Sequence, residues 1–257
     1  MNKKFFFFDI DGTLTNKTTG EIVPSAKLAL DLLQENGHFV ALATGRAHYK
    51  ARKVMESFEL KNMVCAGGAG IVINDILIEN KPLDFDRSIE LINQAEALGY
   101  GVLATKDDTI DVYSKNNLFR EQVGDRQEPT VYHIKEDLSF DEFTDIFKIY
   151  VSIPEKEEHL LTKKNNLGHM RFVHDYLMFQ YDDKKAGIEY MMKKINAPIS
   201  DVVVFGDDTN DLNMFDSQWM NVAMGNAVAE LQGKADYITD TNLNDGIYNA
   251  CKYFNWI

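Results

Sequence analysis

The sequence predicts an α/β fold in which a doubly wound (Rossmann-like) parallel-sheet core carries an inserted α+β domain. Strand and helix patterns alternate at both ends of the 257-residue chain, as they do around a parallel sheet. Apart from Asp201 at the start of the second, the strand patterns over residues 5–8 and 201–205 are continuously apolar, which is typical of strands buried on both faces. Between them, strand patterns that mix polar and apolar residues indicate a sheet covered on one face. We therefore expect core segments at 1–82 and 183–257 and an inserted domain at 83–182.

The first core segment begins with the strand of four phenylalanines at residues 5–8. Ser25 is the expected N-cap of a helix that carries Leu30 and Leu33 at helical spacing and ends at Gly37. The elements expected next are a strand over 39–43, a helix to about residue 58, a strand over 63–66, and a hairpin of strands 71–73 and 76–78 that turns at Asn74-Asp75.

The inserted domain carries both helical and alternating patterns. Its expected helices lie at about 88–98, 140–147 and 155–164, and its expected strands at 101–105, 110–114, 146–153 and 170–181. Because these strands leave one face polar, we expect the sheet on one side of the domain and the helices on the other.

The second core segment again alternates helix and strand patterns, as the first one does. After Lys184 we expect a helix that runs through Ile188, Met191 and Met192. The buried strand over 201–205 follows, residues 212–215 begin another helix, and two short strands are expected at 222–224 and 237–239.

The composition excludes several classes of partner. The formal net charge is −13 and the pI is about 4.9, so that nucleic acids and anionic membranes are repelled. Cys65 and Cys251 have no metal-ligand spacing, and we expect both thiols to be reduced. No apolar run approaches the roughly 18 residues of a membrane span, and the run before Asp9 is too short for a signal peptide. We expect a cytoplasmic protein with no nucleic-acid partner and no membrane partner.

Polar residues follow several of the expected strands at the point where each one ends. They are Asp9 and Asp11, Thr44, and Asp207 with Asn210 and Asp211, and Lys184 stands just before its helix. Groups at the carboxyl ends of parallel strands line the ligand crevice of open α/β folds. Asp9 and Asp11 point the same way in an extended segment, and two like charges so close need a cation or a shared proton.

Their chemistry favours phosphoryl transfer. Carboxylate oxygens suit Mg²⁺, which also takes substrate phosphate oxygens, while a lysine and a threonine hydroxyl supply donors for those oxygens. One carboxylate can attack phosphorus, and its neighbour can move protons.

These residues resemble the four motifs of the haloacid dehalogenase superfamily. The motifs are Phe8-Asp9-Ile10-Asp11-Gly12-Thr13, Thr44-Gly45-Arg46, Lys184, and Gly206-Asp207-Asp208-Thr209-Asn210-Asp211. The position of the insert, between the second and third motifs, resembles the Cof-type sugar-phosphatase branch, which carries a class IIB cap. Residues 222–227 and 235–246 resemble the same branch.

The resemblance implies a Mg²⁺-dependent phosphatase. Asp9 would be the nucleophile that forms an aspartyl phosphate, and Asp11 would protonate the leaving oxygen and then activate water. The implied metal site is the Asp9 carboxylate, the Asp11 main-chain carbonyl and Asp207, with Asp211 orienting the water ligands of the metal from just outside. The implied phosphate-binding residues are Ile10 through its main chain, Thr44, Gly45, Lys184 and Asn210.

The implied substrates are small phosphorylated metabolites, with sugar phosphates first and phosphorylated cofactors such as pyridoxal phosphate or flavin mononucleotide next. The cap would close over the site and select the leaving group. The protein is expected to be a monomer or a homodimer.

The motifs depart from the family pattern at two places, and alternatives stay open. The usual Lys-Gly reads Lys184-Lys185-Ala186-Gly187, so that either lysine can be the phosphate ligand, although an ungapped count favours Lys184. The usual Asn-Gly-Ala reads Gly67-Gly68-Ala69, which puts a side-chain contact near the leaving group in doubt. The role of Arg46 is open.

Two other functions compete with the phosphatase. Within the enzyme class the alternative is a sugar phosphomutase. The alternative outside it is a non-enzymatic phosphoacceptor that resembles a receiver domain. A receiver domain is much shorter and needs no second acid such as Asp11, which serves proton transfer during turnover.

Overall fold

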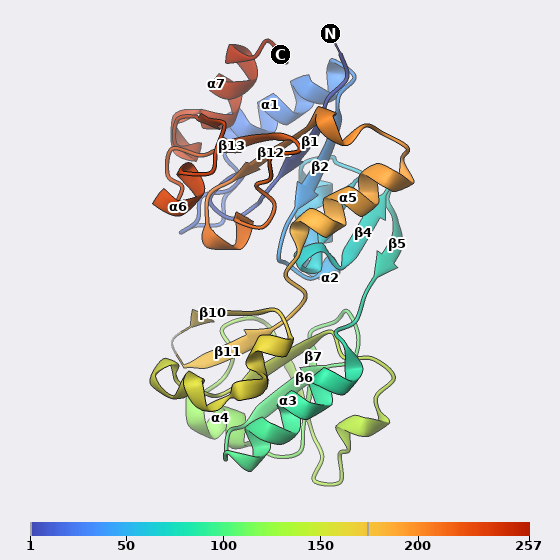
Figure 1. The fold of residues 1–257 in the computed structure, drawn as a ribbon, viewed down its shortest axis with the longest axis vertical. Helices are drawn as coiled ribbons and strands as arrows, with labels where there is room; N and C mark the ends of the chain where they lie inside the picture. Colours follow the sequence, from blue (N-terminus) through green and yellow to red (C-terminus); the bar gives the residue numbers. More distant parts are fainter. Residues whose placement is uncertain (1, 174) are drawn as a thin grey trace. The chain divides into compact units, whose positions relative to one another are not determined.

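The computed structural model describes residues 2–173 and 175–257. The chain divides into two compact units (Figure 1). The first, the core, joins the residues up to Asn80 with Asp183–Ile257, and the second, the cap, is Lys81–Asp182. The first boundary lies two residues before the one expected from the sequence, and the second lies at the expected position.

The core is built on a sheet of eight strands in the order β14-β13-β12-β1-β2-β3-β4-β5. The strands are β1 (Phe5–Phe8), β2 (Phe39–Ala43), β3 (Met63–Cys65), β4 (Gly70–Ile73), β5 (Ile76–Asn80), β12 (Val202–Gly206), β13 (Met220–Ala223) and β14 (Tyr237–Ile238). Neighbours from β14 to β3 are parallel, whereas β4 and β5 are antiparallel additions at one edge. The predicted parallel core is confirmed.

Helices cover both faces of the core sheet, so that the sheet is doubly wound (Figure 1). The helices are α1 (Pro24–Glu35), α2 (His48–Ser57), α5 (Lys184–Lys194), α6 (Ala229–Gln232) and α7 (Gly246–Tyr253). The side chains of strand β1 alternate between the two helical layers. Phe6 and Phe8 pack with α1, α2 and α7, and Phe5 and Phe7 pack with α5 and α6. A strand whose alternate side chains enter two apolar layers must be apolar throughout.

Two core helices differ from expectation. α1 begins at Pro24 with Val23 as its N-cap, so Ser25 is inside the helix and the predicted N-cap was wrong. Proline suits a first helical position because its fixed φ is already helical and its missing N–H costs no hydrogen bond there. No helix starts at residue 212. The segment instead forms a short 3₁₀ turn, Thr209–Asp211, followed by turns.

The cap has its own sheet of six strands in the order β10-β11-β9-β6-β7-β8. The strands are β6 (Val102–Thr105), β7 (Asp111–Ser114), β8 (Val131–Ile134), β9 (Lys148–Val151), β10 (His169–Val173) and β11 (Tyr176–Phe179). The predicted single strand over 170–181 is wrong, because β10 and β11 form an antiparallel hairpin there; residue 174 lies outside the described residues. Apolar residues stand on both sides of the turn, and Asp175 is a weak turn signal, so the sequence does not mark the break between the two strands.

The cap helices are α3 (Phe85–Ala97) and α4 (Leu118–Val123). They pack on opposite faces of the sheet: Val102 and Ala104 share a core cluster with α3, while Leu103 shares one with Phe119 of α4. The expectation that all helices lie on one side was therefore wrong. Phe119 is fully buried and provides the apolar cover of the second face.

The other helices expected in the cap are reduced to 3₁₀ turns. Residues 140–147 contain only Phe140–Glu142, and residues 155–164 contain Glu155–Leu160 and Thr162–Asn166. Buried Leu161 has a non-helical backbone, with φ −86° and ψ 76°, and interrupts the second region. Phe140 is the buried apolar residue of the first turn, and Leu161 lies between the other two turns.

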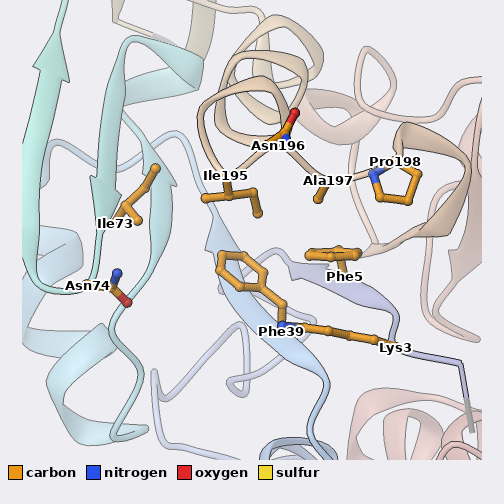
Figure 2. Close-up of a pocket in the computed structure, with 9 residues that line it drawn as sticks. All are labelled: Lys3, Phe5, Phe39, Ile73, Asn74, Ile195, Asn196, Ala197 and Pro198. Atoms are coloured by element: carbon orange, nitrogen blue, oxygen red, sulfur yellow. The ribbon is translucent and has the colours of Figure 1, made fainter.

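The core holds a pocket of about 360 Å³ at the end of the sheet where β1 and β2 begin. Figure 2 shows the rings of Phe39 and Phe5 among the lining residues, with Ile73 to their left and Pro198 to their right. The acids singled out in the sequence follow the opposite ends of the strands, so this pocket is separate from them. Among the described residues, no helix combines the length and apolarity that crossing a membrane requires.

Candidate active site

Two neighbouring strands of the core place acids at the same edge of the sheet. Asp9 follows β1 directly and Asp207 follows β12 directly, and the Asp9 amide donates to the carbonyl of Phe205 at 3.0 Å. With Asp211 they form a buried cluster in which one oxygen from each carboxylate lies within 4.8 Å of the others. Three buried carboxylates this close are a suitable set of oxygen donors for a divalent cation.

Gly12 lets the loop after β1 pass directly against Asp207. Its φ is +94°, and a Cβ at this position would lie 2.3 Å from Oδ2 of Asp207. The next residue, Thr13, donates its hydroxyl to Oδ1 of Asp207 at 3.0 Å, and Asn226 donates to the Gly12 carbonyl at 2.9 Å. A glycine is required here because any side chain would displace the carboxylate.

Asp211 braces the loop that follows β12. Its Oδ2 accepts the main-chain N–H groups of Asp207 at 2.9 Å and of Asp208 at 3.1 Å, and Asp208 completes a capping box. Its Oδ1 accepts the ammonium of Lys184 at 2.6 Å. Both oxygens are therefore engaged by the protein, and Asp211 is a support for the cluster.

Lys184 is the cation inside the cluster. Its Nζ lies 2.7 Å from Oδ1 of Asp9 and 2.6 Å from Oδ1 of Asp211, and the residue is 1% exposed. Lys185 contacts Asp216 at 2.6 Å instead and is partly exposed. Of the two lysines that the sequence left open, the structure brings Lys184 to the acids.

The start of α5 fixes the position of Lys184. Asp183 caps the helix by accepting the N–H of Ala186 at 2.9 Å, and its own amide donates to the carbonyl of Gly67 at 2.7 Å. A Cβ on Gly68 would lie 2.0 Å from the Asp183 carbonyl oxygen. The glycine pair 67–68 thus allows the backbone after β3 to lie directly against the first turn of α5.

Burial and mutual repulsion shift the acids away from their ordinary ionisation. Burial, followed by the charge of Asp211, raises the pKa of Asp9 well above its usual value despite the attraction of Lys184. The same two causes raise the pKa of Asp207 to about 6. Burial opposes the charged form of Lys184, but Asp211 and Asp9 outweigh it and raise the pKa of the ammonium. The cluster therefore carries excess negative charge that a bound cation would stabilise.

Asp11 lies outside the buried cluster and pairs with Arg46. Arg46 binds its two oxygens through Nε at 3.0 Å and Nη2 at 2.5 Å, and the Asp11 side chain is 49% exposed. Thr44, at the end of β2, is buried, and its hydroxyl accepts the Arg46 amide at 3.1 Å. The Thr44-Gly45-Arg46 turn therefore supplies the partner that orients Asp11.

The other implied phosphate ligands have different surroundings. The Ile10 carbonyl accepts from the amides of Leu14 and Thr15 and from the Thr15 hydroxyl, which holds the loop closed. Asn210 is partly exposed in the turn Thr209–Asp211.

Sequence reasoning missed one charged group at the site. The ammonium of Lys17 lies 3.2 Å from Oδ2 of Asp207 and 2.6 Å from Oδ2 of Asp208. Hydrogen bonds to these acids raise the pKa of Lys17, although partial burial opposes its charge. A single lysine in a polar turn has no distinctive pattern, so only the fold reveals its proximity to the acids.

Comparisons with known proteins agree with this geometry. The model of the haloacid dehalogenase-like hydrolase family matches residues 6–251. YkrA of Bacillus subtilis strain 168 is 29% identical over 256 residues, covering 98% of each chain. The 5-amino-6-(5-phospho-D-ribitylamino)uracil phosphatase YcsE of the same organism is 27% identical over 254 residues, which cover 98% of this chain and 95% of YcsE.

A solved structure has the same fold. The subclass IIB sugar phosphatase BT4131 superposes with a TM-score of 0.79 at 24% identity, covering 99% of this chain and all of the other. With a family model that spans both core segments and the cap, the chain belongs to the haloacid dehalogenase-like hydrolases and is a phosphatase of that family.

Proposed function

We propose that the chain is a cytoplasmic Mg²⁺-dependent phosphatase that hydrolyses small phosphorylated metabolites through an aspartyl phosphate on Asp9. The observation that carries the proposal is the buried cluster of Asp9, Asp207 and Asp211 at the carboxyl ends of β1 and β12, with Lys184 inside it. Sugar phosphates are the first candidate substrates, and phosphorylated cofactors such as pyridoxal phosphate or flavin mononucleotide are the next.

The residues present fit a magnesium ion. They offer hard oxygen donors, and Gly12 keeps the space against Asp207 clear of a side chain. Asp9 and Asp207 with the Asp11 carbonyl would hold the ion, and Asp211 would support them from behind. When bound, Mg²⁺ would neutralise phosphate oxygens and stabilise the charge that builds up during transfer.

The first half of the proposed reaction transfers the phosphoryl group to the protein. A carboxylate oxygen of Asp9 attacks phosphorus while the bond from phosphorus to the ester oxygen breaks, and Asp11 gives that oxygen a proton. Lys184 holds Oδ1 of Asp9 at 2.7 Å and thereby fixes the orientation of the nucleophile. Lys184 and the Thr44 hydroxyl donate to the equatorial oxygens of the phosphoryl group.

The second half returns Asp9 to its starting state. Asp11, now ionised, takes a proton from water, and the water oxygen attacks phosphorus as the bond to Asp9 breaks. Inorganic phosphate leaves, and the proton on Asp11 is available for the next leaving group. The half-exposed side chain of Asp11 suits a group that meets both the leaving group and water.

The cap supplies specificity in this proposal. Its separate sheet and core clusters make it an independent unit that can vary without changing the acid cluster. We propose that side chains of the cap choose the leaving group, and that a monomer or a homodimer carries out the reaction.

The test is phosphate release from a panel of phosphorylated metabolites, with and without Mg²⁺. Asp9→Asn is the matched blank because it keeps the size of the side chain and removes the nucleophile. Release that needs both Mg²⁺ and Asp9 supports the proposal. Equal release by Asp9→Asn would refute the nucleophile, and release of the same size in the presence of EDTA would refute the metal.

A further inference from the structure

Lys17 contacts the acid cluster through the ammonium group of a half-exposed side chain. Its ammonium bridges Asp207 Oδ2 at 3.2 Å and Asp208 Oδ2 at 2.6 Å. The side chain of Asp207 is 1% exposed, whereas those of Lys17 and Asp208 are 54% and 34% exposed. Lys17 therefore joins a buried carboxylate to a surface carboxylate.

The charges at this site leave a deficit that matches a divalent cation. Four carboxylates are linked through two ammonium groups, namely those of Asp9, Asp207, Asp208 and Asp211 with those of Lys17 and Lys184. The formal balance is two negative charges. One divalent cation would neutralise it while both lysines remain close by.

The two lysines differ in their freedom to move. Lys184 is 1% exposed and is held by two buried acids, so its position is fixed. Lys17 extends from a tight turn in which Thr15 pairs with Ile22 and the amide of Asn16 donates to the carbonyl of Glu21 at 2.8 Å. Because the turn is held by these contacts, the ammonium of Lys17 can shift by side-chain rotation alone.

We propose that Lys17 is the resident counter-ion of the metal site, bridging Asp207 and Asp208 in the metal-free protein and retaining Asp208 alone when a divalent cation takes Asp207. The inference rests on the proposed function, because it assumes that Asp207 is a metal ligand. Lys17 thereby stabilises the metal-free protein and weakens metal binding, since the cation has to replace the ammonium at Oδ2 of Asp207.

Both effects come from one interaction, so they have to appear together. Lys17→Met removes the ammonium and keeps most of the aliphatic arm. We expect Mg²⁺ to bind roughly 3- to 10-fold more tightly to this variant, because a partly screened ion pair and a like charge are both removed. In EDTA the midpoint of thermal unfolding should fall by about 2 to 4 °C, and saturating Mg²⁺ should reduce that difference to the small contribution of the Lys17–Asp208 contact.

Isothermal titration of metal-free protein with MgCl₂, together with thermal unfolding in EDTA and in saturating Mg²⁺, tests the proposal without any substrate. Lys27→Met is the matched control, because Lys27 also contacts two acids, Asp31 at 2.5 Å and Glu59 at 3.1 Å, but neither is in the cluster. It should leave the Mg²⁺ affinity unchanged. Lys17→Arg keeps the charge and should restore wild-type affinity to within about 2-fold.

The outcomes separate the two proposals. Unchanged Mg²⁺ affinity in Lys17→Met, with wild-type protein binding Mg²⁺, would overturn the counter-ion role and leave the proposed phosphatase intact. Weaker Mg²⁺ binding in Lys17→Met would also overturn it, because Lys17 would then support the ion. No Mg²⁺ binding by the wild-type protein would overturn the metal site and the counter-ion role together.

Discussion

The guanidinium group of Arg46 binds both carboxylate oxygens of Asp11, with Nε 3.0 Å from Oδ2 and Nη2 2.5 Å from Oδ1. Two parallel hydrogen bonds fix the direction of a carboxylate more firmly than a single bond does. The loop that follows β2 thus controls the orientation of the acid that follows β1.

Replacing Arg46 by Met should slow turnover without removing it. Asp11 would keep its proton chemistry but lose its orienting partner, so we expect kcat to fall roughly 10-fold, a part of the 10²–10⁴ that general acid–base catalysis supplies. Steady-state phosphate release measures the change. Arg46→Lys is the control that keeps the positive charge but loses the two parallel N–H donors. Activity close to wild type in Arg46→Met would show that Asp11 needs no such partner.

Gly12→Ala should destabilise the protein more than the comparable change at Gly20. Both glycines have positive φ, +94° and +72°, but a Cβ on Gly12 would lie 2.3 Å from Asp207, whereas nothing lies within 4 Å at Gly20. We expect about 1 kcal/mol of backbone strain at Gly20 and at least about 2 kcal/mol at Gly12. Urea unfolding of the two variants measures the difference. Equal losses would mean that Asp207 moves aside at little cost.

The stability of the metal-free protein should fall as pH rises from about 4 to 6. Burial raises the pKa of Asp207 from 3.8 to about 6, so the folded state holds a proton that the unfolded state releases over this range. The contribution of Asp207 to the free energy of unfolding is largest below pH 4 and is lost as the pH rises to about 6. The total loss is roughly 3 kcal/mol at most. Asp207→Asn should flatten the slope in urea unfolding with EDTA. An equally steep slope in the variant would assign it to other groups.

Lys184→Met should cost far more stability than Lys185→Met. Removing Lys184 leaves Asp9 and Asp211 buried without their cation, at a cost of roughly 3 to 5 kcal/mol. Lys185 makes a partly exposed contact with Asp216, and its loss should cost little stability because the pair is screened by solvent. Chemical unfolding compares the variants directly, and phosphate release should be lost only in Lys184→Met. Loss of phosphate release in Lys185→Met, with release kept in Lys184→Met, would instead assign the phosphate ligand to Lys185.

The elements that the sequence predicts well are those with a strong local cause. The four phenylalanines of β1 are apolar because both faces of the strand are buried, and Asn74-Asp75 turns the hairpin of β4 and β5 with positive φ at both residues. The acids after β1 and β12 converge because parallel neighbours end at one edge. Such features depend only on neighbouring residues or on the common direction of parallel strands.

The features that the sequence does not predict depend on contacts between distant segments. The short helix α4 and strand β8 have weak patterns and exist because Phe119 and Tyr132 complete the second face of the cap sheet. Leu212 follows a turn that the side chain of Asp211 holds closed, so its helical spacing is overridden. Contacts between distant positions also explain why the role of Lys17 stays hidden until the fold is known.

The linkage between cap and core has a consequence for protein engineering. The cap ends at Asp182, and two residues later Lys184 binds Asp9, the proposed nucleophile. Asp183, between them, is held by Gly67 and caps α5. A chimera that takes its cap from a relative therefore has to splice before Asp183 at this junction, because a graft that carried its own residue there would replace the residue that positions Lys184 together with the cap.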